Sequence, residues 1–349
     1  MGPAYPLVTD EELSRYFNEL GFVTGSGALL PLLRQVHKAA CVSDITVLLE
    51  GETGTGKQVL AYAIHCLDQK RRNFPFVTMA CGSLSEALAE SELFGHLKGA
   101  FTGAVTHRKG LFQAAQGGTL FLDDINDLTP YIQAKLLDVL QRSAVRTIGS
   151  DRETQVDVRI VAASNQPLKP LVLQNRFRAD LYHRLNVVRF WLPPLRDRMQ
   201  DLPKLLLSFA HRHQHIYNPI ERVEPDLVSF LQAKPFPGNV RELENDVQGM
   251  LFAKLEGTSL ELADWHRRSA HARTDDDADL LTEAADKVWG AISAQGIPYA
   301  QAIEQLERRV LQAALKVGGC TRKELARRLR TSERTLYHKI RTYELRRPT

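Results

Sequence analysis

A glycine-rich stretch from residue 49 to residue 58, LEGETGTGKQ, carries the clearest chemical signal in this chain of 349 residues. It joins the end of the apolar run DITVLL to the start of the helical pattern KQVLAYAIHCL, the strand–loop–helix setting of a phosphate-binding loop. Glycines let backbone N–H groups curl around phosphates, the helix N-terminus favours negative charge, and Lys57 is placed to reach the β- and γ-phosphates. Gln58 departs from the pattern, because Ser or Thr normally binds magnesium there. The predicted nucleotide-binding residues of this loop are Gly51, Glu52, Thr53, Gly54, Thr55, Gly56, Lys57 and Gln58.

Two carboxylates, Asp123 and Asp124, end the apolar strand pattern TLFLDD, sixty-six residues beyond Lys57. The carboxyl ends of parallel strands meet at one edge of a sheet, so the pair is expected beside the phosphate loop. Asp123 would hold Mg²⁺, usually through water, and Asp124 would orient the attacking water. The alternative, two acids that cap the next helix, fits less well because both loop and strand are present. The chain is therefore predicted to bind ATP and Mg²⁺.

A second glycine-rich stretch contains a lone aromatic ring and a hydroxyl. Its residues are Gly99, Ala100, Phe101, Thr102, Gly103 and Ala104. Two glycines around one phenylalanine favour neither a helix nor a strand. One interpretation is a turn whose Phe101 fills the core, and the other is a loop tip that presents Phe101 and Thr102 to a partner. The stretch alone does not decide between them.

The end of the chain is basic while the rest is acidic. Residues 306–349 hold 13 Lys and Arg against 4 Asp and Glu, whereas the preceding residues hold 32 against 37. The pattern TRKELARRL, a short turn and SERTLYHKIRTYEL predicts two helices of a helix-turn-helix, with an apolar face of Leu325, Leu329, Leu336 and Ile340. Arg330 replaces the usual turn glycine. The predicted base-contacting residues are Arg334, Thr335, His338 and Lys339, and the predicted phosphate contacts are Arg322, Lys323 and Arg341.

The elements that position these residues alternate between strand and helix up to about residue 190, which predicts an α/β domain with a parallel sheet. Helical patterns follow to about residue 262, and ARTDDDADLL is typical of an exposed linker. The chain has no signal-peptide pattern and no apolar run long enough for a bilayer, and its four cysteines lack metal-ligand spacing. These features predict a cytoplasmic protein with reduced thiols and no membrane partner.

Six motifs occur here in the order found in the AAA+ domains of bacterial enhancer-binding proteins, the activators of sigma-54 RNA polymerase. They are GETGTGK, SELFGHLKGAFTGA, GGTLFLDD, FRADLYHRLNVV, LPPLRDR and FPGNVRELEN. The resemblance covers about residues 21–265, and a Fis-type helix-turn-helix extends it nearly to the C-terminus. It implies a short arm (1–20), an AAA+ α/β core (21–190), a helical lid (191–265), a linker (266–300) and a DNA-binding domain (301–349). It further implies that Phe101 and Thr102 contact sigma-54, with the flanking glycines as hinges.

The resemblance also implies roles for four polar residues. Arg178 and Arg184 match the arginine fingers that act on the γ-phosphate of a neighbouring subunit, so the active site would require a ring, by similarity a hexamer. Asn165 and Arg241 match the two sensors of nucleotide state. Surface salt bridges or helix caps remain alternative roles for these residues, although their order along the chain favours the fingers and sensors.

Three hypotheses about the activity remain open. The favoured one is a ring-forming ATPase that binds enhancer DNA and remodels the sigma-54 holoenzyme, as a homo-oligomer between dimer and hexamer. A protein-unfolding AAA+ enzyme would give the helix-turn-helix no role. A slowly hydrolysing subunit of a hetero-oligomer is suggested by Gln58, Ala80 and Asp124, since the family has asparagine and glutamate at the last two positions. Many members begin with a sensory domain, and only about twenty residues precede the core here, so control by a separate regulatory protein or a longer chain is expected.

Overall fold

The computed structural model describes residues 9–25, 27–101, 104–217, 219–268, 289, 293, 298–316, 326 and 333–343. The chain divides into two compact units, residues 1–268 and 269–349, each of which is described by itself. No helix among the described residues is long and apolar enough to cross a membrane.

A five-stranded parallel sheet forms the centre of the first unit. Its order is β2-β5-β8-β1-β9, with bounds Phe76–Ala80, Thr119–Asp123, Arg159–Ser164, Val47–Glu50 and Val188–Trp191. Every residue of β1 and β8 is buried, as expected for central strands that have helices on both faces. The sheet thus confirms the predicted α/β class.

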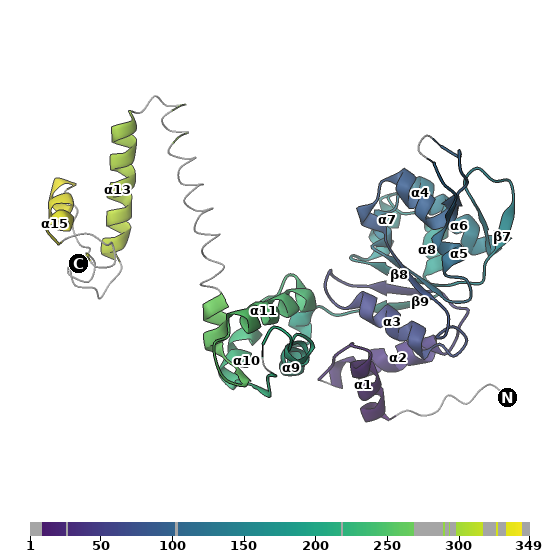
Figure 1. Cartoon of the computed structure of the whole chain (residues 1–349), viewed down its shortest axis with the longest axis horizontal. Coiled ribbons are helices and arrows are strands. Elements are labelled where there is room, and N and C mark those ends of the chain that lie inside the picture. The colour runs from purple at the N-terminus through teal and green to yellow at the C-terminus, as the bar shows by residue number, and fades with distance from the viewer. Residues whose placement is uncertain are drawn as a thin grey trace. The chain divides into compact units, whose positions relative to one another are not determined.

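Helices cover the sheet on both faces (Figure 1). One face carries α1 (Asp10–Glu19), α2 (Leu30–Ala40) and α3 (Lys57–Leu67). The other face carries α4 (Glu86–Phe94), α5 (Leu111–Ala114), α6 (Pro130–Arg142), α7 (Leu168–Leu173) and α8 (Ala179–Leu185). Two small antiparallel pairs extend from this second face: β3 (Gly95–His96) with β4 (Arg108–Lys109), and β6 (Ala144–Arg146) with β7 (Glu153–Gln155).

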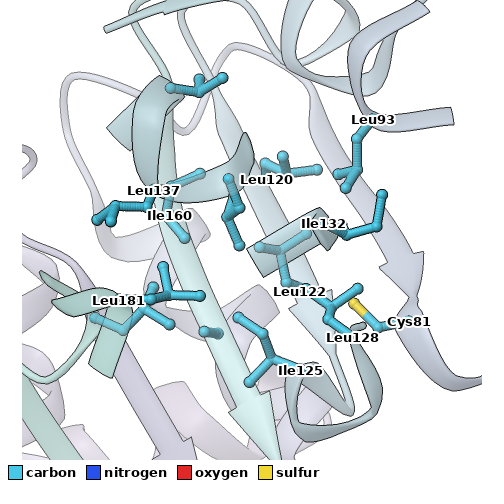
Figure 2. Packing of buried hydrophobic residues seen from close by; sticks show 14 of the residues in the cluster. Cys81, Leu93, Leu120, Leu122, Ile125, Leu128, Ile132, Leu137, Ile160 and Leu181 are labelled. Atoms are coloured by element: carbon cyan, nitrogen blue, oxygen red, sulfur yellow. The ribbon is translucent and has the colours of Figure 1, made fainter. Parts of the chain in front are cut away.

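In strands β1, β5 and β8, successive residues point into two separate cores. In β5, Leu120 and Leu122 enter the core under α4–α8, while Phe121 enters the core under α1–α3. Figure 2 shows the first core, where Leu120 and Leu122 lie among Ile132, Ile160 and Leu181. This alternation is the normal consequence of strand geometry.

Two elements of the core were absent from the sequence prediction. Strand β9 was missed because it is an edge strand in which Arg189 and Trp191 are exposed, so its apolar run is broken. Helix α1 lies within the segment assigned to an N-terminal arm, yet its Leu13 and Phe17 are buried in the second core. Its sequence signal is a capping box, in which the Thr9 side chain accepts from the Glu12 N–H and Glu12 accepts from the Thr9 N–H.

A helical lid follows the sheet. It contains α9 (Leu202–Arg212), α10 (Pro225–Gln232) and α11 (Asn239–Ala253), with a short parallel pair of β10 (Arg222–Val223) and β11 (Ser259–Leu260). Leu206 and Phe209 of α9 pack with Leu243 and Val247 of α11 in a third apolar core. Two 3₁₀ turns, Leu195–Asp197 and Met199–Asp201, connect β9 to α9.

The second unit holds α13 (Tyr299–Lys316) and α15 (Glu333–Thr342). Leu311 and Leu315 of α13 pack against Leu336 and Ile340 of α15, which confirms the predicted inward positions of the last two residues. The predicted core residues Leu325 and Leu329, the turn residue Arg330 and the phosphate contacts Arg322 and Lys323 lie outside the described residues.

Candidate nucleotide site and macromolecular contact surfaces

The phosphate loop leaves β1 at Glu50 and enters α3 at Lys57, as predicted. Gly51, Gly54 and Gly56 all have positive φ, of +153°, +79° and +103°. A Cβ on Gly54 would lie 2.2 Å from the Gly238 oxygen, and one on Gly51 would lie 2.6 Å from the Leu192 oxygen. These two positions therefore accept no side chain, because both backbone conformation and space require glycine.

Lys57 is the first residue of α3 and is buried. Its Nζ donates to the carbonyl oxygens of Gly51 at 2.7 Å and Glu52 at 3.0 Å. Burial lowers the pKa of Lys57, and the nearby carboxylates of Asp123 and Asp124 oppose that effect. The ammonium is thus held at the opening of the loop, where phosphate oxygens would compensate for the water contacts that burial removes.

Asp123 and Asp124 stand at the carboxyl end of β5. Burial and the neighbouring Asp124 raise the pKa of Asp123, so a cation at this point would be favoured electrostatically. Asp124 has a left-handed backbone, φ 50° and ψ 48°, and its N–H donates to Asp123 Oδ1 at 3.1 Å. Asp and Asn adopt this conformation more readily than most residues, which gives a local reason for the shorter acid here.

A cavity of about 240 Å³ joins the loop, the acidic pair and the lid. Its lining contains loop residues 53–58, Asp123, Asp124 and Arg241, which the sequence analysis assigned to nucleotide or metal binding, whereas Gly51 and Glu52 of the same assignment do not line it. Sequence reasoning missed the other lining residues, most of which come from remote segments: Gly21, Phe22, Val23, Val59, Arg198, Leu205, Phe209, Arg212, Val240 and Glu244. The apolar residues of the lining suit a nucleotide base. The backbone amides, the lysine and the carboxylates suit a magnesium-bound triphosphate. The residues of the cavity therefore fit the predicted ATP and Mg²⁺.

Arg178, Arg184 and Asn165 lie outside this cavity. Arg178 is exposed and pairs with Asp180 at 2.7 Å, whose carboxylate raises the pKa of Arg178. Arg184 donates to the Leu140 carbonyl at 2.8 Å. Asn165 follows β8, and its N–H donates to Asn126 Oδ1 at 3.4 Å. The roles implied for these three residues stay predictions.

Ala80 is the last residue of β2 and is in register with Asp123 of β5. The position where the family has asparagine therefore adjoins the acidic pair directly. A methyl group cannot hydrogen-bond a carboxylate, so the position contributes no side-chain restraint on Asp124.

The glycine-rich stretch at 99–104 belongs to the loop between β3 and β4, residues 97–107, called the contact loop below. Phe101 is 43% exposed, which excludes the interpretation that it fills the core. The Phe101 and His96 rings pack in a T-shaped arrangement with centroids 5.1 Å apart, and His96 Nδ1 lies 2.7 Å from Ser91 Oγ. Thr102 and Gly103 lie outside the described residues.

The predicted DNA-contacting residues of α15 differ in their surroundings. Thr335, His338 and Arg341 are exposed, whereas the side chain of Arg334 lies outside the described part of the chain. Lys339 forms an ion pair with Glu307 of α13, and the Tyr343 hydroxyl donates to the same carboxylate at 2.6 Å. Lys339 thus also joins the two helices.

The sheet with its phosphate loop, together with the helical lid over the cavity, defines the AAA+ class of P-loop ATPase domains. Three family models match the chain: the Sigma-54 interaction domain at residues 22–190, the AAA+ ATPase lid domain at 196–280 and the bacterial regulatory proteins of the Fis family at 302–343. The transcriptional regulatory protein ZraR of Klebsiella oxytoca is 39% identical over 323 residues, which cover 92% of this chain and 69% of ZraR. The chain belongs to the sigma-54-dependent transcriptional activator family.

Other similar proteins agree with this assignment. The Nif-specific regulatory protein of Herbaspirillum seropedicae is 48% identical over 224 residues, 64% of this chain. The crystal structure of NtrX from Brucella abortus in complex with ATP has a TM-score of 0.65 and 26% identity, and the match covers 96% of this chain and 73% of NtrX. The chain spans 41% of the length of the Herbaspirillum protein and 60% of the Nif-specific regulatory protein of Bradyrhizobium diazoefficiens.

Proposed function

We propose that this protein is a DNA-bound, ring-forming ATPase that remodels RNA polymerase holoenzyme carrying sigma-54. One observation carries the proposal: a single cavity brings together Lys57, the Asp123–Asp124 pair and Arg241 of the lid. These residues come from three separate parts of the chain, and together they supply the charges that ATP hydrolysis requires.

Each residue has a defined task in this proposal. The loop amides and Lys57 bind the phosphates, and Asp123 holds Mg²⁺, which neutralises charge on the phosphate oxygens when bound. Asp124 orients the attacking water. Arg241 reaches the phosphates from the lid, since its side chain has no hydrogen bond within the described residues, and Asn165 senses the nucleotide state from the end of β8.

Arg178 and Arg184 would act on the nucleotide of a neighbouring subunit. Neither side chain lines the nucleotide cavity of its own chain, and this supports action on the nucleotide of a neighbouring subunit. A homo-oligomeric ring, by family resemblance a hexamer, follows from this arrangement. Such arginines contribute roughly 10³–10⁵ in rate.

The contact loop would engage sigma-54 through Phe101 and Thr102. The exposure of Phe101 and the positive φ of Gly99, +82°, support a tip that presents an aromatic ring on a pliable backbone. Nucleotide-dependent movement of this loop would pass the energy of hydrolysis to the polymerase.

The second unit would bind enhancer DNA as part of a dimer or larger assembly. Exposed Thr335 and His338 on α15 would face the bases, and Arg341 would face the backbone. Deleting the residues after Asp286 should abolish specific binding in an electrophoretic mobility assay while the first unit keeps its melting temperature. Binding of the full chain should weaken steeply with salt, and specific binding by the deletion variant would contradict the assignment.

A second candidate is a slowly hydrolysing member of a hetero-oligomer. It is favoured by the methyl group of Ala80 beside the acidic pair and by the short side chain of Asp124. Steady-state ATP turnover over a range of protein concentrations tests both candidates. Turnover that rises cooperatively with concentration supports the active ring, and turnover that appears only with a partner subunit supports the second candidate.

A further inference from the structure

The N-terminus of the lid helix α11 is attached to the phosphate loop by one buried side chain. Asn239 has no exposed surface, and its Nδ2 donates to Glu52 Oε2 at 3.2 Å and to the Thr53 carbonyl at 3.0 Å. Its Oδ1 accepts from the Leu195 N–H at 2.8 Å. A single amide thus ties together the loop, the turn that leads into the lid, and the first residue of α11.

The backbone of α11 adds to this attachment. The N–H groups of Val240 and Arg241 donate to the Gly54 carbonyl at 3.0 and 3.3 Å. These groups belong to the first turn of α11, whose N–H groups have no partner inside the helix. The phosphate loop therefore fixes the backbone position from which the Arg241 side chain extends.

An ion pair on the outer side completes the arrangement. Arg196 donates to both oxygens of Glu52, at 2.8 and 2.6 Å, in the two-point geometry that fixes a guanidinium against a carboxylate. Arg196 lies next to Leu195, so it anchors the same turn that Asn239 holds. The hydrogen bonds from Arg196 and Asn239 lower the pKa of Glu52 to about 2.

We propose that Glu52, Arg196 and Asn239 are positioning residues that act through Arg241. They hold α11 on the phosphate loop, so that the Arg241 side chain is already directed at the phosphate end of the cavity when ATP enters. The inference rests on the proposed ATP-binding function. Its physical basis is preorganisation, since a cation that is held in place loses little freedom on binding.

The test compares ATP affinities of the full-length protein and its variants by titration with a fluorescent ATP analogue. Arg196→Gln removes the charge and the two-point contact from an exposed side chain that stays polar, and it should weaken binding by about three- to fivefold, the range of a partly exposed ion pair. Arg241→Gln should weaken binding more. The double variant should bind as weakly as Arg241→Gln alone, because Arg196 acts only through Arg241.

A matched control is Arg222→Gln, which removes another exposed lid arginine that pairs with a glutamate, Glu224 at 3.0 Å. It should leave ATP affinity unchanged. Arg196→Lys should restore part of the affinity, since lysine keeps the charge and loses the two-point contact.

Fully additive effects in the double variant would overturn the inference, and so would unchanged affinity of Arg196→Gln while the wild type binds ATP. Failure of the wild type itself to bind ATP would contradict the proposed function and the inference together. The two failures are therefore distinguishable. Melting temperatures of all variants separate a loss of folding from a loss of affinity.

Discussion

Glycines serve the nucleotide cavity and the contact loop in different ways. In the cavity, Gly51 and Gly54 combine positive φ with neighbours that leave no space for a Cβ. In the contact loop, Gly99 has a similar φ of +82°, yet a Cβ there would meet nothing within 4 Å. The first region requires glycine for shape and the second only for backbone freedom.

This difference shows that the nucleotide cavity is formed before any ligand binds, whereas the contact loop exposes a side chain on a less constrained backbone. The cavity is lined by backbone that several buried hydrogen bonds fix, including those from Lys57 and Asn239. Phe101 in the contact loop has one ring contact and is almost half exposed. A small, constant ligand suits the first arrangement, and a large partner that binds in only one state suits the second.

The comparison predicts its largest effect for Gly54→Ala. The added methyl group would collide with the Gly238 carbonyl and strain the backbone, so the lid could not rest on the loop. ATP affinity should fall by more than about a hundredfold, which corresponds to about 3 kcal/mol. Gly99→Ala is the matched control at similar φ, and it should bind ATP like the wild type in the same titration. Equal loss in both variants would remove the distinction between the two regions.

The next effect concerns Asp124, whose side chain is one C–C bond, about 1.5 Å, shorter than glutamate. A displacement of about 1 Å can cost on the order of 10²-fold in rate. Asp124→Glu should therefore raise ATP turnover at fixed protein concentration, by tenfold or more on the same scale, although the left-handed backbone favours aspartate. Adding Ala80→Asn should restore a restraint on the longer acid. A native protein that already turns over as fast as either variant would show that Asp124 is a competent catalytic residue.

Phe101→Ala tests the role of the contact loop. ATP binding, oligomerisation and melting temperature should stay unchanged, because the ring lies outside the apolar cores. Binding to sigma-54 in a pull-down with a transition-state analogue of ATP should fall by about thirtyfold or more, the size of an interface hot spot. Val105→Ala, an exposed apolar residue of the same loop, is the control. A large drop in melting temperature for Phe101→Ala would assign the ring to folding.

The smallest effect is a pH dependence of stability at Glu52. Its pKa of about 2 in the folded protein lies below the ordinary value of 4.5, so the Arg196–Glu52 pair stabilises the fold fully above about pH 4.5. This contribution disappears as the pH falls from 4.5 through 2. Because both side chains are partly exposed, it amounts to about 1 kcal/mol or less, or about 2–4 °C. Thermal melts should give a higher melting temperature for the wild type than for Glu52→Gln near neutral pH, and this difference should vanish in acid. A difference that does not change with pH would contradict the pairing.

Sequence reasoning found the parts of the site that are continuous in the chain. The phosphate loop, Asp123 and Asp124 follow from local patterns, because the strand that carries each also sets its position. Val23, Phe209 and Glu244 could not be found this way, since only the packing of the segment after α1, of α9 and of α11 around the loop brings them together. The ion pair of Lys339 with Glu307 is similar, because residues on separate helices meet only through the apolar core of the second unit.

The strand order also bears on synthesis. The strand before the phosphate loop, β1, has β8 and β9 as its two partners, and β8 begins more than a hundred residues after Glu50. At about 5–20 residues per second, a ribosome needs on the order of ten seconds to make that stretch. The nascent chain carries the apolar segment VLL of β1 without a sheet partner during this time. The ATP site is therefore among the last parts of the α/β domain to assemble at the ribosome, and its strand is a segment for chaperones to shield.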